Sequence, residues 1–101
     1  MEITLLLKDP PGGRCRLYRA YAEALTEHAQ AQCHERFDGL PQQPELQAPA
    51  MLIDGEVVIP EDGVLLSPQD IGRTLADTHP EAARLEAVLE STLETCMQEW
   101  S

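Results

Sequence analysis

A chain of 101 residues has room for one small domain with its own hydrophobic core, and its apolar content of 43% is too high for a disordered protein. The formal net charge of −11, from 18 acidic and 7 basic side chains, disfavours nucleic acid and anionic membranes as partners. No apolar stretch approaches the roughly 20 residues that span a bilayer, and the opening MEITLLLKDPP lacks the basic segment of a secretory signal, so we expect a cytoplasmic protein.

The first predicted element is a short buried strand at residues 2–8, EITLLLK, which ends at the breakers Asp9-Pro10-Pro11-Gly12-Gly13. Its three consecutive leucines are typical of a central strand with both faces covered. Residues 14–32 then lack proline and glycine, and apolar side chains recur among them at a spacing of three to four. This spacing predicts an amphipathic helix, on which Tyr18 and Tyr21 are interpreted as packing residues.

A loop and a hairpin are predicted in the middle of the chain. Residues 33–38 are a weaker strand candidate, and the proline-containing residues 40–48, LPQQPELQA, indicate a loop. Residues 50–54 and 56–59 are rich in strand formers and flank Asp54-Gly55. An Asp-Gly pair between two such runs predicts a tight β-hairpin, because both turn positions tolerate positive φ.

Two helices are predicted to close the chain. Ser67-Pro68-Gln69-Asp70 gives the first of them a serine N-cap, a proline in its first position and an acid at the positive end of its dipole. Thr78-His79-Pro80-Glu81 repeats this device before the last helix. That helix has an apolar face and a separate acidic line with one-turn spacing, formed respectively by Leu85, Val88, Leu89, Leu93, Cys96, Met97 and Trp100 and by Glu86, Glu90 and Glu94.

Three segments resemble the thioredoxin-like family. LLLKDPPGGRCRLYRAYAEAL is similar to its first strand, active-site loop and first long helix, APAMLIDGEVVI to its cis-proline loop and hairpin, and GVLLSPQDIGRTL to its closing turn and helix. The resemblance covers residues 2–78, is greatest to the small, glutaredoxin-sized members, and implies an α/β fold with a thioredoxin-like β-α-β-β-α three-layer core. Residues 1–101 would then be a single thioredoxin-like domain, with residues 79–101 as an additional C-terminal helical extension.

The resemblance gives Pro49 a role. In this family the proline at the corresponding position has a cis peptide bond and packs against the active-site loop, and the residue before it offers main-chain groups to an extended substrate. Ala48-Pro49 fits this position, and cis bonds are rare and usually purposeful. The alternative is an ordinary trans proline at the first residue of an edge strand.

The chain departs from the family where the family's chemistry lies. A redox-active member needs two thiols spaced C-x-x-C, one as the nucleophile at the helix N-terminus and one to resolve the mixed disulfide. Here the loop reads Gly12-Gly13-Arg14-Cys15, so Cys15 falls on the resolving position and Gly12 on the nucleophile's. A shift of three residues would instead make Cys15 a single nucleophile, and the family's buried acid below the site is absent in both cases.

Cys15 therefore has three interpretations. It is a buried small residue of an inactive domain, or a single reactive thiol activated by Arg14, Arg16 and the helix dipole, or a metal or cluster ligand completed by a second chain. Cys33 and Cys96 lack zinc-type spacing and are interpreted as structural, so all three thiols are expected to be free. We expect no resident metal and no cofactor.

The expected function is a binding or adaptor role without catalysis, in which a protein partner or an extended peptide contacts Gly12, Gly13, Arg14, Ala48 and Pro49. The first alternative is a monothiol redox protein that exchanges with glutathione or a protein disulfide through Cys15. The second is metal or cluster carriage, because an arsenical-resistance metallochaperone family resembles this layout, although it carries paired cysteines that this chain lacks. The apolar face of the last helix is expected to pack on its own sheet or to form a homodimer.

Overall fold

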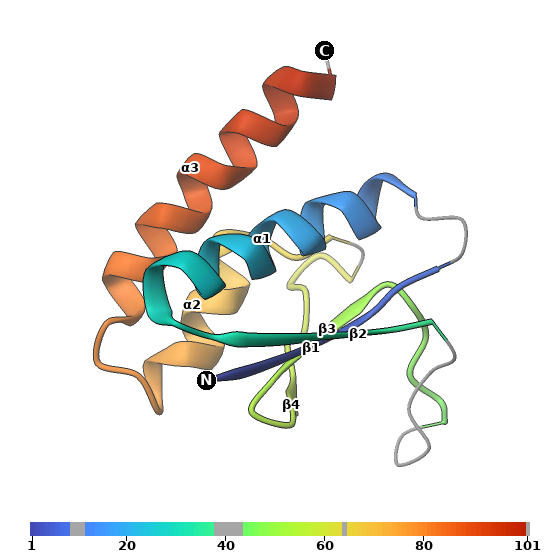
Figure 1. Cartoon of the computed structure of the whole chain (residues 1–101), viewed down its shortest axis with the longest axis horizontal. Helices are drawn as coiled ribbons and strands as arrows, with labels where there is room; N and C mark the ends of the chain where they lie inside the picture. The colour runs from blue at the N-terminus through green and yellow to red at the C-terminus, as the bar shows by residue number, and fades with distance from the viewer. Residues whose placement is uncertain (9–11, 38–43, 64, 101) are drawn as a thin grey trace.

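The described residues, 1–8, 12–37, 44–63 and 65–100 (with only the main chain of Trp100), form a four-stranded sheet and three helices in this computed structural model (Figure 1). The elements in chain order are β1 (Glu2–Leu6), α1 (Gly13–Ala29), β2 (Gln32–Arg36), β3 (Ala50–Ile53), β4 (Glu56–Val57), α2 (Pro68–Ala76) and α3 (Ala82–Trp100). This is the predicted order. The predicted breaker at residues 9–11 and the loop at residues 40–43 lie outside the described residues. No helix within the described ranges is long and apolar enough to cross a membrane.

β1 lies between two neighbours in the sheet, whose strand order is β2-β1-β3-β4. It runs parallel to β2, with Ile3 opposite Cys33, and antiparallel to β3, with Leu5 opposite Met51. α1 connects the two parallel strands, because parallel neighbours need a crossover, whereas a tight turn joins the antiparallel β3 and β4. The fold is therefore α/β with a mixed sheet.

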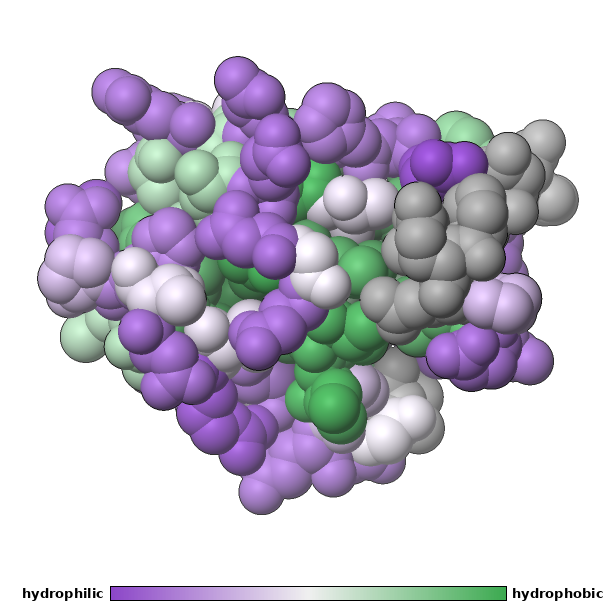
Figure 2. Space-filling view, turned by 90° about the horizontal axis from the view of Figure 1, so that it is seen from below, coloured by the Kyte–Doolittle hydropathy of each residue, from purple (hydrophilic) through white to green (hydrophobic). Residues whose placement is uncertain are grey.

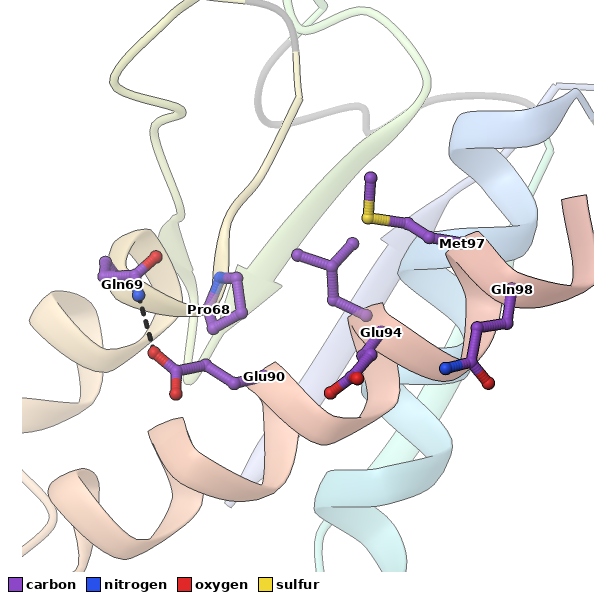
Figure 3. Close-up of a pocket in the computed structure, with 7 residues that line it drawn as sticks. Pro68, Gln69, Glu90, Glu94, Met97 and Gln98 are labelled. Atoms are coloured by element: carbon purple, nitrogen blue, oxygen red, sulfur yellow. Dashed lines mark hydrogen bonds between the residues drawn. The ribbon is translucent and has the colours of Figure 1, made fainter. Parts of the chain in front are cut away.

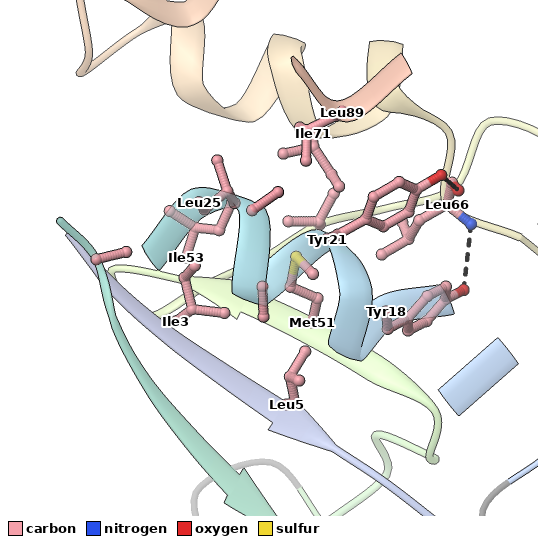
Figure 4. Close-up of a cluster of buried hydrophobic side chains, with 14 of the residues drawn as sticks. Ile3, Leu5, Tyr18, Tyr21, Leu25, Met51, Ile53, Leu66, Ile71 and Leu89 are labelled. Carbon is pink, nitrogen blue, oxygen red and sulfur yellow. Dashed lines mark hydrogen bonds between the residues drawn. The ribbon is translucent and has the colours of Figure 1, made fainter. Parts of the chain in front are cut away.

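The main core lies between the sheet and the helices (Figure 4). Alternate residues of a strand point to opposite faces, and Ile3 and Leu5 of β1 point to the helical side together with Met51 and Ile53 of β3. They meet buried side chains of all three helices, which include Leu17, Tyr18, Tyr21, Leu25, Ile71, Leu75, Leu85 and Leu89. Full burial of one such side chain contributes about 1.5–3 kcal/mol, so this layer is the main source of stability.

The opposite face of the sheet is covered without a helix. Its buried residues are Leu6 of β1 and Ala50 and Leu52 of β3, packed against the half-buried Leu46, Ala48 and Val57. Figure 2 views the molecule from this side and shows hydrophobic residues near its centre. The leucine run is buried on both sides as predicted. The described residues between β2 and β3 form no helix, since prolines interrupt this segment. The predicted three-layer core therefore has no helix on this face of the sheet within the described residues.

α1 begins within one residue of its predicted start and ends earlier than predicted. Gly12 is its N-cap in an extended conformation, and no side chain of the described residues caps its first turn. At the other end, Gln30 has a left-handed conformation with φ of 55°, and its N–H donates to the carbonyl of Leu25. The helix was predicted to reach residue 32, but Gln32 instead enters β2 and pairs with Glu2 of β1.

The predicted Asp54-Gly55 turn joins β3 to β4, and both residues have positive φ, 51° and 85°. The Asp54 side chain also contacts two distant segments. Its Oδ1 accepts a hydrogen bond from the N–H of Glu2 over 2.8 Å, and its Oδ2 lies 3.2 Å from Nε2 of His79. These hydrogen bonds, the one from the Glu2 amide first, lower the pKa of Asp54. The turn is thereby tied to the start of β1 and to the α2–α3 connection.

α2 has the N-terminal cap that the sequence predicts. Ser67 Oγ accepts from the N–H of Asp70 over 3.2 Å, and Asp70 Oδ2 accepts from the N–H of Ser67 over 2.9 Å, which together form a capping box. Oδ1 of the buried Asp70 also accepts from the N–H of Glu61 and from Arg73. Burial by itself raises the pKa of Asp70, but the hydrogen bonds to its two oxygens together outweigh burial and lower it.

α3 begins at Ala82, after the residues that were predicted to open it. Two of those residues instead end α2, since the N–H groups of Thr78 and His79 both donate to the carbonyl of Leu75. α3 packs mainly on α1 and α2, whereas its apolar face was predicted to pack on the sheet or to form a homodimer. Its buried Leu85 and Leu89 belong to the main core, and Met97 near its end is 59% exposed. The first half of the predicted extension is therefore part of the core.

Candidate functional site

A pocket of about 340 Å³ opens where the start of α1, the loop before β3 and the segment after β4 meet. Three of the predicted site residues, Arg14, Ala48 and Pro49, line it together. The rest of the lining comes from α1, from β3 and β4 with their flanking residues, and from the segment before α2, namely Tyr18, Leu46, Gln47, Ala50, Val57, Val58, Ile59, Pro60, Gly63 and Leu66. Segments that are distant in the sequence thus share one surface.

The Ala48–Pro49 peptide bond is cis, as the resemblance implies. Both residues are half-buried, and Ala48 also packs against the second face of the sheet. In the described part of the chain, the main-chain groups of Gln47 and Ala48 make no hydrogen bond to other main-chain groups. Because main-chain N–H and C=O groups are strong donors and acceptors, these are available to an extended ligand.

Two tyrosines that were predicted only to pack on the helix face hold one wall of this pocket. The Tyr18 hydroxyl accepts a hydrogen bond from the N–H of Leu66, and the Tyr21 hydroxyl donates one to the carbonyl of Leu66, each over 3.1 Å (Figure 4). Burial is the main cause that raises the pKa of both tyrosines, so both hydroxyls are protonated at neutral pH. α1 thereby positions Leu66, which lines the pocket.

Arg14 gives the pocket its charge. It is the only charged residue in the described lining, in a chain whose formal net charge is −11. Most of the remaining lining is apolar, and Ile59 is 74% exposed at this surface. Such a site suits an apolar side chain close to a carboxylate, because each would meet a complementary surface.

Gly12 and Gly13 do not line this pocket. Both are exposed at the start of α1, and a Cβ atom at either position would have no described heavy atom within 4 Å. The carbonyl of Gly12 accepts from the N–H of Arg16 over 3.2 Å, as in an ordinary first helical turn. Nothing in the described residues requires glycine at these positions, and the contribution of Gly12 and Gly13 to binding stays a prediction.

Cys15 is buried in the core. It is the third residue of α1, is 2% exposed, and its Sγ accepts a hydrogen bond from the N–H of Lys8 over 3.4 Å. It does not line the pocket beside Pro49. Of the three interpretations of Cys15, the buried small residue fits this environment best, because a nucleophilic thiol needs access to its substrate.

The other two cysteines are also free, Cys33 exposed on β2 and Cys96 half-buried on α3. Partial desolvation of its thiol group, with the neighbouring Glu35, raises the pKa of Cys33, and burial raises the pKa of Cys96. Both are therefore held toward the thiol form, which is the less reactive one. Within the described ranges, no three His, Cys, Asp or Glu side chains lie together as metal ligands would.

The other ten lining residues were not assigned to this site from the sequence, and three of them illustrate why. Tyr18, Ile59 and Leu66 line the pocket, but they belong to separate segments and form no short motif that a sequence search finds. Comparison with known proteins adds no further assignment: no protein-family model matches the chain, and neither does any curated protein or any solved structure.

Proposed function

We propose that this protein is a thioredoxin-like binding domain that holds an extended peptide beside Ala48–Pro49 without redox catalysis. The observation that carries the proposal is the pocket in which Arg14 of α1 meets the loop before β3. The order of strands and helices supports the family assignment, since it is the order that the resemblance implies. The cis bond at Ala48–Pro49 agrees with it as well.

The bound peptide would lie along the loop before β3. Its main chain pairs with the N–H and C=O groups of Gln47 and Ala48, which bond to no main-chain group of the described residues. One apolar side chain enters the pocket against Tyr18 and Ile59. A carboxylate of the peptide faces Arg14, whose charge locally offsets the repulsion from a chain of net charge −11. Binding of this kind needs no reactive thiol.

The burial of Cys15 argues against monothiol exchange as the main function. A mixed disulfide forms only when a thiolate reaches the partner sulfur, yet Cys15 is 2% exposed and lies outside the pocket. Metal or cluster carriage has less support, because Cys15 would have to share its metal with ligands of a second chain and is buried. Peptide binding uses groups that are accessible at the surface.

Selection of a phage-displayed peptide library against the whole protein tests the proposal. Selected peptides are expected to share an apolar residue near an acid and to shift the amide resonances of Arg14, Gln47 and Ala48. Ile59→Asp is expected to weaken binding about tenfold or more, because burial of an aliphatic side chain contributes about 1.5–3 kcal/mol. Arg14→Ala is expected to weaken the binding of acidic peptides selectively.

Met97→Asp is the matched control, since Met97 is also an exposed hydrophobic residue but lies near the far end of α3. This variant is expected to bind the selected peptides as the wild type does. Peptides that bind Ile59→Asp with unchanged affinity, or resonance shifts that cluster away from the pocket, would overturn the proposal. Far-ultraviolet circular dichroism of each variant establishes that it is folded.

A further inference from the structure

α3 runs outward past the helices on which its first half packs (Figure 1). Together with the start of α2, the middle and second half of α3 line a groove (Figure 3). The groove has a volume of about 360 Å³ and is lined by Pro68, Gln69, Glu90, Leu93, Glu94, Met97 and Gln98. Pro68 and Leu93 give it an apolar floor, together with Met97, which is 59% exposed. This surface shares no lining residue with the pocket beside Pro49.

The polar side of this groove is acidic. Glu90 and Glu94 lie one turn apart on α3, and Oε1 of Glu90 accepts a hydrogen bond from Nε2 of Gln69 over 2.7 Å (Figure 3). No lysine or arginine is among the described lining residues, and neither glutamate is in an ion pair with another described residue. Like charges one turn apart repel each other, so a cation placed between them is favoured.

The negative charge continues on the other side of α3. A second groove, of about 530 Å³, lies between α1 and α3, and its described lining includes Glu23, Glu27 and Glu99 but no lysine or arginine. The 7 basic side chains of the chain therefore all lie outside the described linings of the two grooves. The second half of α3 thus combines apolar surface with a negative field, which attracts basic partners.

We infer that the groove between α2 and α3 docks a basic amphipathic segment of another protein. An apolar side chain of this segment lies between Pro68 and Met97, and its lysines or arginines face Glu90 and Glu94. Both kinds of contact are needed, because the apolar floor contributes affinity and the charges select the partner and orient it. The wall at Pro68 is preformed, since the capping box holds the start of α2.

A second copy of this chain is a less suitable occupant. A symmetric contact between two α3 helices would bring Glu90 and Glu94 of one copy close to the same residues of the other. The single base of α3 is Arg84, at the opposite end of the helix, and each copy has a net charge of −11. Charge therefore disfavours a homodimer, which was one of the two arrangements predicted for the apolar face of the last helix.

The test uses a fluorescein-labelled synthetic helical peptide with leucines on one face and lysines on the other, titrated with the whole protein. We expect saturable binding that salt weakens, with a shift of the Met97 methyl resonance, and no binding of the same peptide with glutamates in place of lysines. The double variant Glu90→Gln, Glu94→Gln is expected to weaken binding roughly fivefold, as is Met97→Ser.

The matched control is the double variant Glu45→Gln, Glu56→Gln, which also removes two exposed charges but lies outside the described linings of both acidic grooves. It is expected to change the affinity by less than about twofold, since salt screens the interaction of the peptide with charges that lie outside the groove. An equal loss in both double variants would mean general attraction to an acidic surface and would overturn the inference, as would absence of binding or full affinity in Met97→Ser. A dimer of the protein alone in sedimentation, lost in Met97→Ser, would assign the groove to a second copy instead.

Discussion

Tyr18 and Tyr21 hold Leu66 from both sides: the Tyr18 hydroxyl accepts its N–H and the Tyr21 hydroxyl donates to its carbonyl, each over 3.1 Å. The two rings come from adjacent turns of α1, and Leu66 stands directly before the capping serine of α2. Leu66 is 1% exposed, so water would not readily replace a lost tyrosine hydroxyl. α1 thus fixes both the entry to α2 and one wall of the candidate site.

Tyr21→Phe is expected to lower the free energy of unfolding by about 1–3 kcal/mol, because the buried carbonyl of Leu66 loses its hydrogen-bond donor. Urea denaturation measures the change. The control is Thr95→Ala, whose hydroxyl bonds to the carbonyl of Ser91 on an exposed part of α3, with an expected change within about 0.5 kcal/mol. Similar small changes in both variants would show that Leu66 does not depend on Tyr21.

Asp70 is expected to make stability depend on acid. Its pKa in the folded protein lies below the ordinary value of about 3.9, so its stabilising contribution is present above that value and is lost as pH falls through the folded pKa. Asp70→Asn is therefore expected to cost about 1–3 kcal/mol at neutral pH, with a smaller difference from the wild type in strong acid. Thermal unfolding across this pH range measures it. A difference that stays constant across that range, or an equal effect of the exposed Asp77→Asn, would contradict the assignment.

Alkylation by iodoacetamide is expected to follow the exposure of the three thiols. Cys33 is exposed, Cys96 is half-buried and Cys15 is buried, so Cys33 should react first and Cys15 only when the protein unfolds. Mass spectrometry of timed digests reports each site, and Cys33→Ser removes the fast phase. Labelling of native Cys15 at the rate of Cys33 would restore the monothiol redox function as the better interpretation.

Leu89→Ala is expected to destabilise the protein by about 2–5 kcal/mol, because Leu89 is fully buried in the main core. Met97→Ala, on the same helix but 59% exposed, is expected to change stability by at most about 0.5 kcal/mol. Chemical denaturation compares the two. If the two costs were equal, α3 would be an accessory helix and not part of the core.

Structural features that depend only on residues close together in the sequence were predictable. The capping box of Ser67 and Asp70 and the turn at Asp54-Gly55 depend on local side chains and local φ values, and both are present. The end of α1 was misplaced because Gln32 pairs with β1, which is distant in the sequence. Long-range pairing overrode a continuous helical pattern there.

The candidate site was predictable only in part. Arg14 and Pro49 were proposed from the resemblance and do line one pocket. The hydrogen bond between Tyr18 and Leu66 joins residues 48 positions apart, and no local pattern predicts such a pair. The burial of Cys15 was one of three open interpretations, because it depends on how closely Lys8 and the core surround the first turn of α1.

The position of β2 at one edge of the sheet has a consequence for the protein at high concentration. An edge strand offers unpaired main-chain donors and acceptors to any neighbouring chain, and this is a common route to aggregation. Four of the five residues of β2 are exposed, and its sequence, QCHER, is polar and charged. Glu35 is also held in an ion pair with Arg19, with a distance of 2.7 Å between Oε2 and Nε. These hydrated side chains disfavour the pairing of β2 with a strand of a neighbouring molecule.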